Sequence, residues 1–236
     1  MPAQPLVDSH IHLWPQSAAN PSGHGWMEPG HHLTRQYSID DYLKASSTSD
    51  ADVKGFVYVE TDRKLGEGSQ LSQYAEQPLE EIKFLRRIVE GQGDGEGNRS
   101  GHAHLMKGAV VWAPIDRGLG VFEEYLAEAE RVAGRETWKR IKGFRYLLQG
   151  IHDQEQFTKL ALNDKTMQVL RAFNDKSKGR NFVFDVGVDQ RQGGIWQLEK
   201  AVSMIEAVHL GVKEDEKVTF ILSMGSLLLN LDRLLM

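Results

Sequence analysis

The sequence contains no cysteine. Its 236 residues therefore cannot form disulfides, bind zinc through thiolates or use a thiol nucleophile. Any metal would have to be held by histidine and carboxylate side chains. The sequence also lacks an uninterrupted apolar run of about 18 residues, the length that a membrane-spanning helix requires, so we expect no membrane span.

A strong excess of one charge is also absent. The 28 Lys and Arg residues are opposed by 33 Asp and Glu residues, and no basic stripe is present. We therefore expect no nucleic-acid partner. Residues 1–7 lack the basic and apolar regions of a secretory signal, which is why we expect a cytoplasmic location.

Short apolar runs alternate with helical patterns along the chain. Most of the runs are continuously apolar, which is typical of parallel strands that are covered on both faces. The expected strands are 6–7, 55–59, 109–113, 143–148, 182–188 and 218–222. The expected helices are 78–89, 121–132 and 195–210, with a short helix that a capping box opens at Ser38. This alternation predicts one α/β domain over residues 1–236.

The number of strands predicts the architecture. A complete (β/α)8 barrel takes about 250 residues and eight strands, and only six strands are expected here. We therefore predict an incomplete, TIM-like (β/α)8 barrel. Residues 91–101 contain five glycines and no large apolar side chain, so we expect a flexible surface insertion. The long loop 14–36 follows the first strand, where barrel enzymes often place substrate contacts.

Asp8, His10 and His12 carry the sharpest chemical pattern. Residues two apart in a strand point to the same side, so the two imidazoles can face one space. Such a pair suits two ligands of one divalent cation, zinc above all. A His-x-His pair alone is weak evidence for a metal site, but its place at the end of the first expected strand favours a functional role.

Five motifs resemble a known family. Residues 7–14 (VDSHIHLW) are similar to the opening strand of amidohydrolase-related TIM-barrel hydrolases, which include sugar-lactone and dicarboxylate-lactone hydrolases. The similarity continues at 55–61 (GFVYVET), 108–113 (GAVVWA), 142–149 (KGFRYLLQ) and 184–188 (FDVGV). It covers roughly residues 5 to 223. The first and fourth of these motifs are the most specific.

The resemblance implies roles for individual residues. His10 and His12 would bind the metal, or would polarise the substrate in members that work without one. Arg145 would stabilise the substrate carbonyl or carboxylate with its fixed donor fork, or else form an ion pair with Asp8 or Glu60. Further candidates are two carboxylates at strand ends, Glu60 and Asp185, and four substrate-binding side chains, Trp14, Trp26, Tyr146 and His152.

The resemblance ends near residue 223. The family continues with a histidine that binds metal or substrate, and its eighth strand supplies an aspartate that acts as general base; this sequence has neither. Residues 224–236 are rich in leucine instead, which predicts a short helix that covers the open edge or mediates self-association. Two interpretations therefore stay open. The chain is either a hydrolase that opens a lactone or similar cyclic ester or amide (with decarboxylation as a sister reaction), or a catalytically silent, truncated barrel or interaction fragment.

Overall fold

The computed structural model describes residues 4–48, 51–93, 95, 98–99, 101–189 and 193–223. It contains two compact units, residues 1–145 and 146–236. None of the helices in the described ranges combines the length and the apolar character that crossing a bilayer requires.

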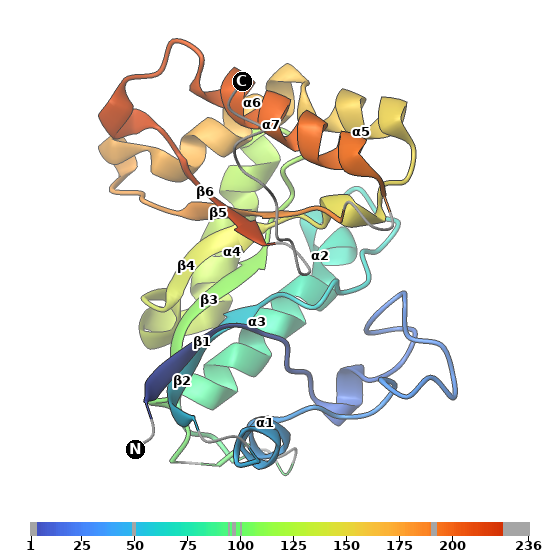
Figure 1. Cartoon of the computed structure of the whole chain (residues 1–236), viewed down its shortest axis with the longest axis vertical. Coiled ribbons are helices and arrows are strands. Elements are labelled where there is room, and N and C mark those ends of the chain that lie inside the picture. The colour runs from blue at the N-terminus through green and yellow to red at the C-terminus, as the bar shows by residue number, and fades with distance from the viewer. Residues whose placement is uncertain are drawn as a thin grey trace. The chain divides into compact units, whose positions relative to one another are not determined.

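The first unit contains a parallel sheet with its strands in chain order (Figure 1). The strands are β1 (Pro5–Ile11), β2 (Asp52–Val59), β3 (Met106–Trp112) and β4 (Ile141–Arg145). Val59 pairs with Val110, and Trp112 pairs with Arg145. Because neighbouring strands are parallel and end in step, the residues that follow them gather at one edge of the sheet.

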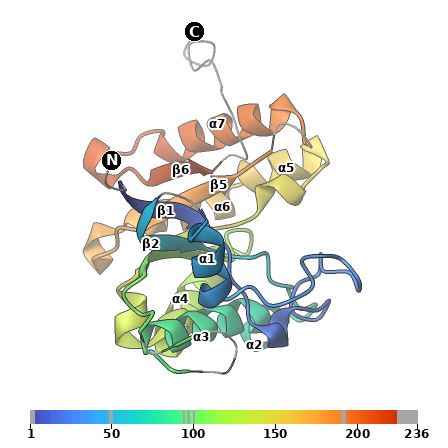
Figure 2. The same ribbon diagram turned by 60° about the horizontal axis from the view of Figure 1, so that its bottom comes forward.

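The helices of the first unit are α1 (Ile39–Ser46), α2 (Leu71–Tyr74), α3 (Glu76–Val89) and α4 (Leu119–Trp138), with a 3-10 turn, η1 (Gln16–Ala18). Helix α3 packs against α4 and β3, so these two helices cover one face of the sheet (Figures 1 and 2). Their apolar stripes explain this, since Ile82 and Leu85 of α3 and Phe122 of α4 are completely buried. The ring of Phe122 meets that of Phe144 on β4 edge to face.

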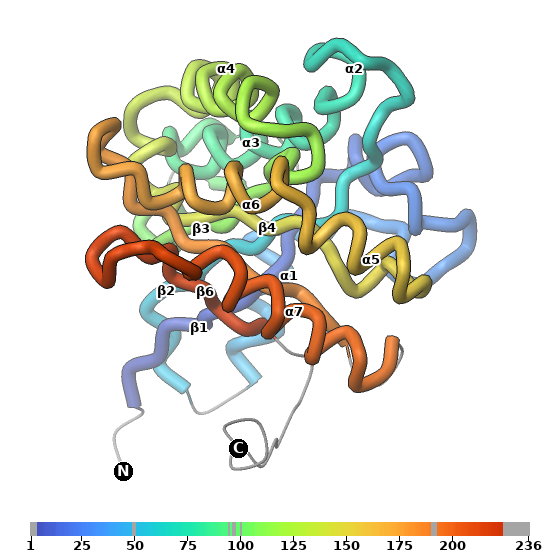
Figure 3. The backbone as a smooth tube through the Cα atoms, turned by 90° about the horizontal axis from the view of Figure 1, so that it is seen from above, coloured from blue at the N-terminus to red at the C-terminus, as the bar shows by residue number. Residues whose placement is uncertain are grey.

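The second unit contains the parallel pair β5 (Val183–Gly187) and β6 (Thr219–Ser223). Its helices are α5 (Gln154–Ala161), α6 (Asp164–Arg171) and α7 (Ile195–His209), and α7 packs against the other two (Figure 3). Its described residues also form the 3-10 turns η2 (Leu148–Gly150), η3 (Ala172–Asn174), η4 (Lys176–Lys178) and η5 (Glu214–Glu216). With six parallel strands and helices between them, the predicted fold class, an incomplete α/β TIM-like barrel, is confirmed.

Several element boundaries differ from the prediction. The fourth strand ends at Arg145, not at residue 148, because the chain leaves the sheet there and turns at η2. Within α4, Gly134 has a non-helical backbone with φ 65° and ψ 165°, so the first helical stretch ends there as predicted, and a second short stretch continues to Trp138. The short helices α2, α5 and α6 were not predicted from the sequence.

The predicted capping box is confirmed: the Ser38 side chain accepts from the backbone of Asp41, and the Asp41 carboxylate accepts from the backbone of Ser38. The described part of segment 91–101 is not free of contacts, because Asn98 is buried and Arg99 forms an ion pair with Asp40 on α1. The leucine-rich segment 224–236 lies outside the described residues.

The packing of α3 gives a first testable prediction. Replacing Leu85, which is completely buried, with alanine should cost about 2–5 kcal/mol through lost burial and a residual cavity. Thermal unfolding followed by circular dichroism should show the melting temperature falling by about 5 °C or more. Lys83→Ala on the exposed face of the same helix removes only a surface pair with Glu80 and should change stability by about 0.5 kcal/mol at most. Equal losses in the two variants would contradict this packing.

Candidate active site

The imidazoles of His10 and His12 meet at the carboxyl end of β1. Their Nε2 atoms are 3.2 Å apart, and the two rings meet edge to face with their centres 4.9 Å apart. The alternation of the strand turns both side chains to the same side, although β1 itself ends at Ile11. The backbone N–H of His10 also donates to the Asp8 carboxylate. The two rings therefore present two nitrogens to one point.

The surroundings of His12 define its tautomer. Its Nδ1 lies 3.0 Å from the carbonyl oxygen of Val59, which only accepts, so Nδ1 carries the hydrogen and donates. Burial lowers the pKa of His12, and the positive charge of Arg145 lowers it further. His12 is therefore held neutral with its lone pair on Nε2, and the proton between the two rings comes from Nε2 of His10.

Arg145 and Glu60 form a buried ion pair beside the histidines. The Nε of Arg145 donates to Oε1 of Glu60 at 2.6 Å, and its Nη2 donates to the Glu60 carbonyl oxygen at 2.8 Å. The second carboxylate oxygen of Glu60 accepts a hydrogen bond from the N–H of Asp62, whose φ of 55° lies in the left-handed region. Of the two ion-pair partners that the sequence left open, Asp8 and Glu60, the structure has Glu60.

Opposing effects determine the pKa of Glu60. Burial raises the pKa of Glu60 to about 7, the guanidinium of Arg145 opposes this rise, and the charge of Glu81 adds to it. Arg145 directs Nε and Nη2 at Glu60, while its Nη1 makes no hydrogen bond within the part of the chain that the structure describes. Arg145 is thus fixed in place and keeps a donor for a further acceptor.

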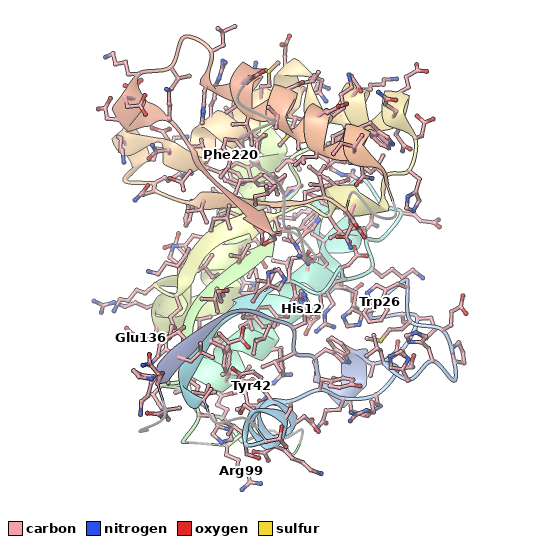
Figure 4. The ribbon with its side chains drawn as sticks, in the orientation of Figure 1. His12, Trp26, Tyr42, Arg99, Glu136 and Phe220 are labelled. Carbon is pink, nitrogen blue, oxygen red and sulfur yellow. The ribbon has the colours of Figure 1, made fainter. Side chains whose placement is uncertain are left out.

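A groove of about 540 Å³ opens beside His12. Its lining includes the aromatic side chains of Tyr37 and Tyr42 and the cationic side chains of Arg35 and Lys44. Figure 4 shows His12 near the end of β1 and Tyr42 on α1. The volume lies within the range of small-molecule sites, so a compact ligand can approach His12 through this groove.

The long loop 14–36 carries its own small core next to the site. Trp14 is only 5% exposed and its indole N–H donates to the Arg35 carbonyl, so it packs inside the loop. Trp26, labelled in Figure 4, is partly buried, and its N–H donates to the carbonyl oxygen of Thr61. His24 is completely buried between the Ala18 carbonyl and the Thr61 hydroxyl. The loop is thereby anchored to the residue that follows Glu60.

The other candidates from the sequence belong to the second unit. Asp185 on β5 is 2% exposed, and its Oδ1 has no hydrogen-bond partner among the described residues. Tyr146 is partly buried and His152 is exposed. These three residues lie in the second unit, whereas the group of His10, His12, Glu60 and Arg145 lies in the first.

Sequence reasoning missed a further buried carboxylate, Glu81. The sequence places it in the first turn of a helix starting at residue 78, but α3 begins at Glu76 and Glu81 is completely buried within it. It accepts hydrogen bonds from Tyr58 and Thr61 and lies 3.7 Å from Nε of Arg63. The signal was present, because Glu81 shares the apolar face of the helix with Leu85.

The two histidines supply part of a zinc site. Zinc binds nitrogen at about 2.0–2.1 Å, so two Nε2 atoms 3.2 Å apart can both reach one ion. Structural and catalytic zinc sites use three or four protein ligands. The described residues contain no group of three or more His, Cys, Asp or Glu side chains that could hold a metal. The described donors therefore do not make a complete zinc site.

Comparisons with known proteins agree with the motifs. No family model matches the chain. Over 205 residues it is 31% identical to an L-rhamnono-gamma-lactonase of Scheffersomyces stipitis. The aligned region covers 86% of this chain and 57% of the relative's length. Its fold resembles Amidohydrolase 2 from Bifidobacterium longum subsp. infantis, with a TM-score of 0.50, 16% identity and coverage of 93% of this chain and 72% of that chain. The aligned region thus spans little more than half of the lactonase's length, and the match to the solved structure shows a shared fold.

His24 makes the stability of the first unit depend on pH. Burial lowers the pKa of His24 from 6.5 to about 4, and Arg63 contributes. Between these values the unfolded chain binds a proton that the folded chain does not. The stabilisation is therefore complete above pH 6.5 and is lost as the pH falls to 4, by about 3 kcal/mol.

Urea unfolding at a series of pH values measures this effect. His24→Gln should lower stability at pH 7 and remove this part of the slope between pH 6.5 and 4. His32→Gln, which changes an exposed histidine of the same loop, should keep the slope of the wild type. An unchanged slope in His24→Gln would mean that His24 is not the titrating group.

Proposed function

We propose that this chain, which the comparisons relate to amidohydrolase-type lactonases, opens a lactone ring by adding water to the ring carbonyl. The observation that carries the proposal is the histidine pair at the end of β1 beside the buried Arg145–Glu60 ion pair. The chain spans 57% of the lactonase's length, so the activity of that protein is extended here to this chain as a proposal.

His12 is the proposed general base. Its lone pair on Nε2 is held toward His10 by the hydrogen bond that Nδ1 donates to Val59. A water molecule that enters between the two rings replaces the ring-to-ring hydrogen bond and can give its proton to Nε2 of His12 as its oxygen attacks the carbonyl carbon. The lowered pKa of His12 supports this role, because the ring is neutral and able to accept a proton at neutral pH.

Arg145 is the proposed oxyanion stabiliser. The attack turns the carbonyl oxygen into an anion, and Nη1 is the donor of Arg145 that Glu60 leaves available. Glu60 fixes the plane of the guanidinium through two contacts, so little reorganisation accompanies the reaction. Collapse of the tetrahedral intermediate breaks the bond to the ring oxygen, which takes the proton back from His12. Lactone and water thus become one hydroxy acid.

The substrate contacts are also proposals. The groove beside His12 offers aromatic and cationic side chains to a polyhydroxylated ring, which suits a sugar lactone. Trp14 and Trp26 support the loop that borders the histidines, and Tyr146 and His152 are further candidates for substrate contact. Asp185 is the candidate for a second carboxylate, since its buried Oδ1 has no partner among the described residues.

We also propose that His10 and His12 bind a divalent metal ion, with zinc as the first candidate. Two converging nitrogens support it, and the lack of a third donor in the described residues opposes it. No step of the mechanism above passes through a metal. Self-association through residues 224–236 and a cytoplasmic location are likewise proposals.

Arg145 provides the direct test of the mechanism. With L-rhamnono-γ-lactone as the first substrate, Arg145→Lys keeps the charge but loses the guanidinium fork, and kcat should fall by about 100-fold or more. Arg131→Lys, in an exposed pair with Glu128, should leave kcat unchanged. Titration of the released acid with a pH indicator measures both. The proposal would be wrong if the unmodified chain opened none of a panel of sugar lactones, or if Arg145→Lys were fully active.

Zinc binding is expected to be weak. Calorimetric titration should give a dissociation constant far above that of complete zinc sites, because two nitrogens are fewer than the three or four ligands required. His12→Gln should abolish the remaining binding, whereas His32→Gln should not change it. Light scattering on the same sample gives the molar mass. Tight, stoichiometric zinc in a monomer would show that the chain completes the site by itself.

A further inference from the structure

Glu81 is the most enclosed charge near the candidate site, and the mechanism above does not use it. It lies on α3, its side chain is completely buried, and its Oε1 collects three hydrogen bonds. Its Oε2 has no hydrogen-bond partner among the described residues, and Arg63, also buried, lies 3.7 Å from Oε1. Burying such a pair costs desolvation that its own attraction need not recover, so stability alone does not account for it.

Two of the hydrogen bonds hold the residue after Glu60. Both the backbone N–H and the hydroxyl of Thr61 contact Oε1 of Glu81, at 3.0 and 2.7 Å. The position of Thr61 determines where the chain leaves β2, and so where the Glu60 carboxylate meets Arg145. Thr61 also contacts His24 and Trp26 of the long loop. One carboxylate thus orders the end of β2 and, through it, the loop.

The third hydrogen bond reaches the residue after His12. The hydroxyl of Tyr58 lies 2.7 Å from Oε1 of Glu81 and 3.2 Å from the carbonyl oxygen of Leu13, so its proton is shared between them. Burial and the charge of Glu81 raise the pKa of Tyr58 well above its usual value, so the hydroxyl stays a donor. The chain leaving β1 is thereby tied to the same carboxylate as the chain leaving β2.

We infer that Glu81 is a positioning residue, which sets the relative placement of His12 and of the Glu60–Arg145 pair by holding Leu13, through Tyr58, and Thr61. The inference rests on the proposed function for its catalytic consequence, but the placement of His12 can be tested without it. Displacing reactive groups by about 1 Å can cost about 100-fold in rate. Loss of Glu81 should therefore lower kcat more than it changes KM.

The sharpest variant removes both buried charges. Glu81→Leu combined with Arg63→Met replaces the ion pair by apolar groups of similar size, so the protein should stay folded. We expect a lowered melting temperature, because the buried donors of Thr61 and Tyr58 lose their acceptor. In the folded double variant, kcat should fall by about 100-fold and KM should change less than about threefold. Glu80→Leu, the neighbouring exposed position on α3, is the matched control and should keep kcat.

A merely structural role predicts a different result, because any variant that folds without Glu81 would then keep its activity. A folded double variant with kcat within about twofold of the unmodified chain would overturn the inference. So would a rise in KM alone. If the double variant does not fold, Tyr58→Phe cuts only the link to Leu13 and should still lower kcat while Thr61 keeps its contacts with Glu81.

Nuclear magnetic resonance of the histidine rings tests the placement without any substrate. The His12 ring signals, assigned with His12→Gln, should move in Tyr58→Phe and in the double variant. Those of His209, which contacts the Val218 carbonyl in the second unit, should not. Stationary His12 signals would refute the positioning role. Shifted signals in a chain that opens no lactone would refute the proposed function but leave the positioning role intact.

Discussion

The ion pair between Arg145 and Glu60 is the interaction on which the candidate site depends. It joins the end of β4 to the end of β2, on either side of β3, and both side chains are almost completely buried. A charge left alone in such surroundings would be strongly destabilising, so each residue requires the other. The pair therefore fixes the edge of the sheet at which the two histidines also lie.

A second layer of polar contacts lies beneath this edge. Glu81 reaches from α3 to Tyr58 and Thr61, and the loop 14–36 reaches the same point through His24. These groups are buried, so each unmet hydrogen bond would cost free energy, and the arrangement has few alternatives. The residues that follow these strands are thereby held in one geometry, which a reaction at His12 requires.

Much of the framework could be predicted from local patterns. Continuous apolar runs identified the six strands of the described residues, and apolar stripes identified α3, α4 and α7. Short helices such as α5 and α6 were missed, because eight residues contain too few turns for a clear period. Glu81 was missed because a glutamate near the expected start of a helix is usually exposed, and only the packing of α3 against the sheet buries it.

The sequence by itself determined the alternation of strands and helices and the shared side of His10 and His12, because strand periodicity acts between near neighbours in the chain. Only the tertiary structure decided that Arg145 pairs with Glu60 rather than Asp8, and that Tyr58, Thr61 and Glu81 meet. Arg145 and Glu60 are 85 positions apart. Contacts at such separations depend on strand register and helix packing, which arise from the whole core and which no local pattern encodes.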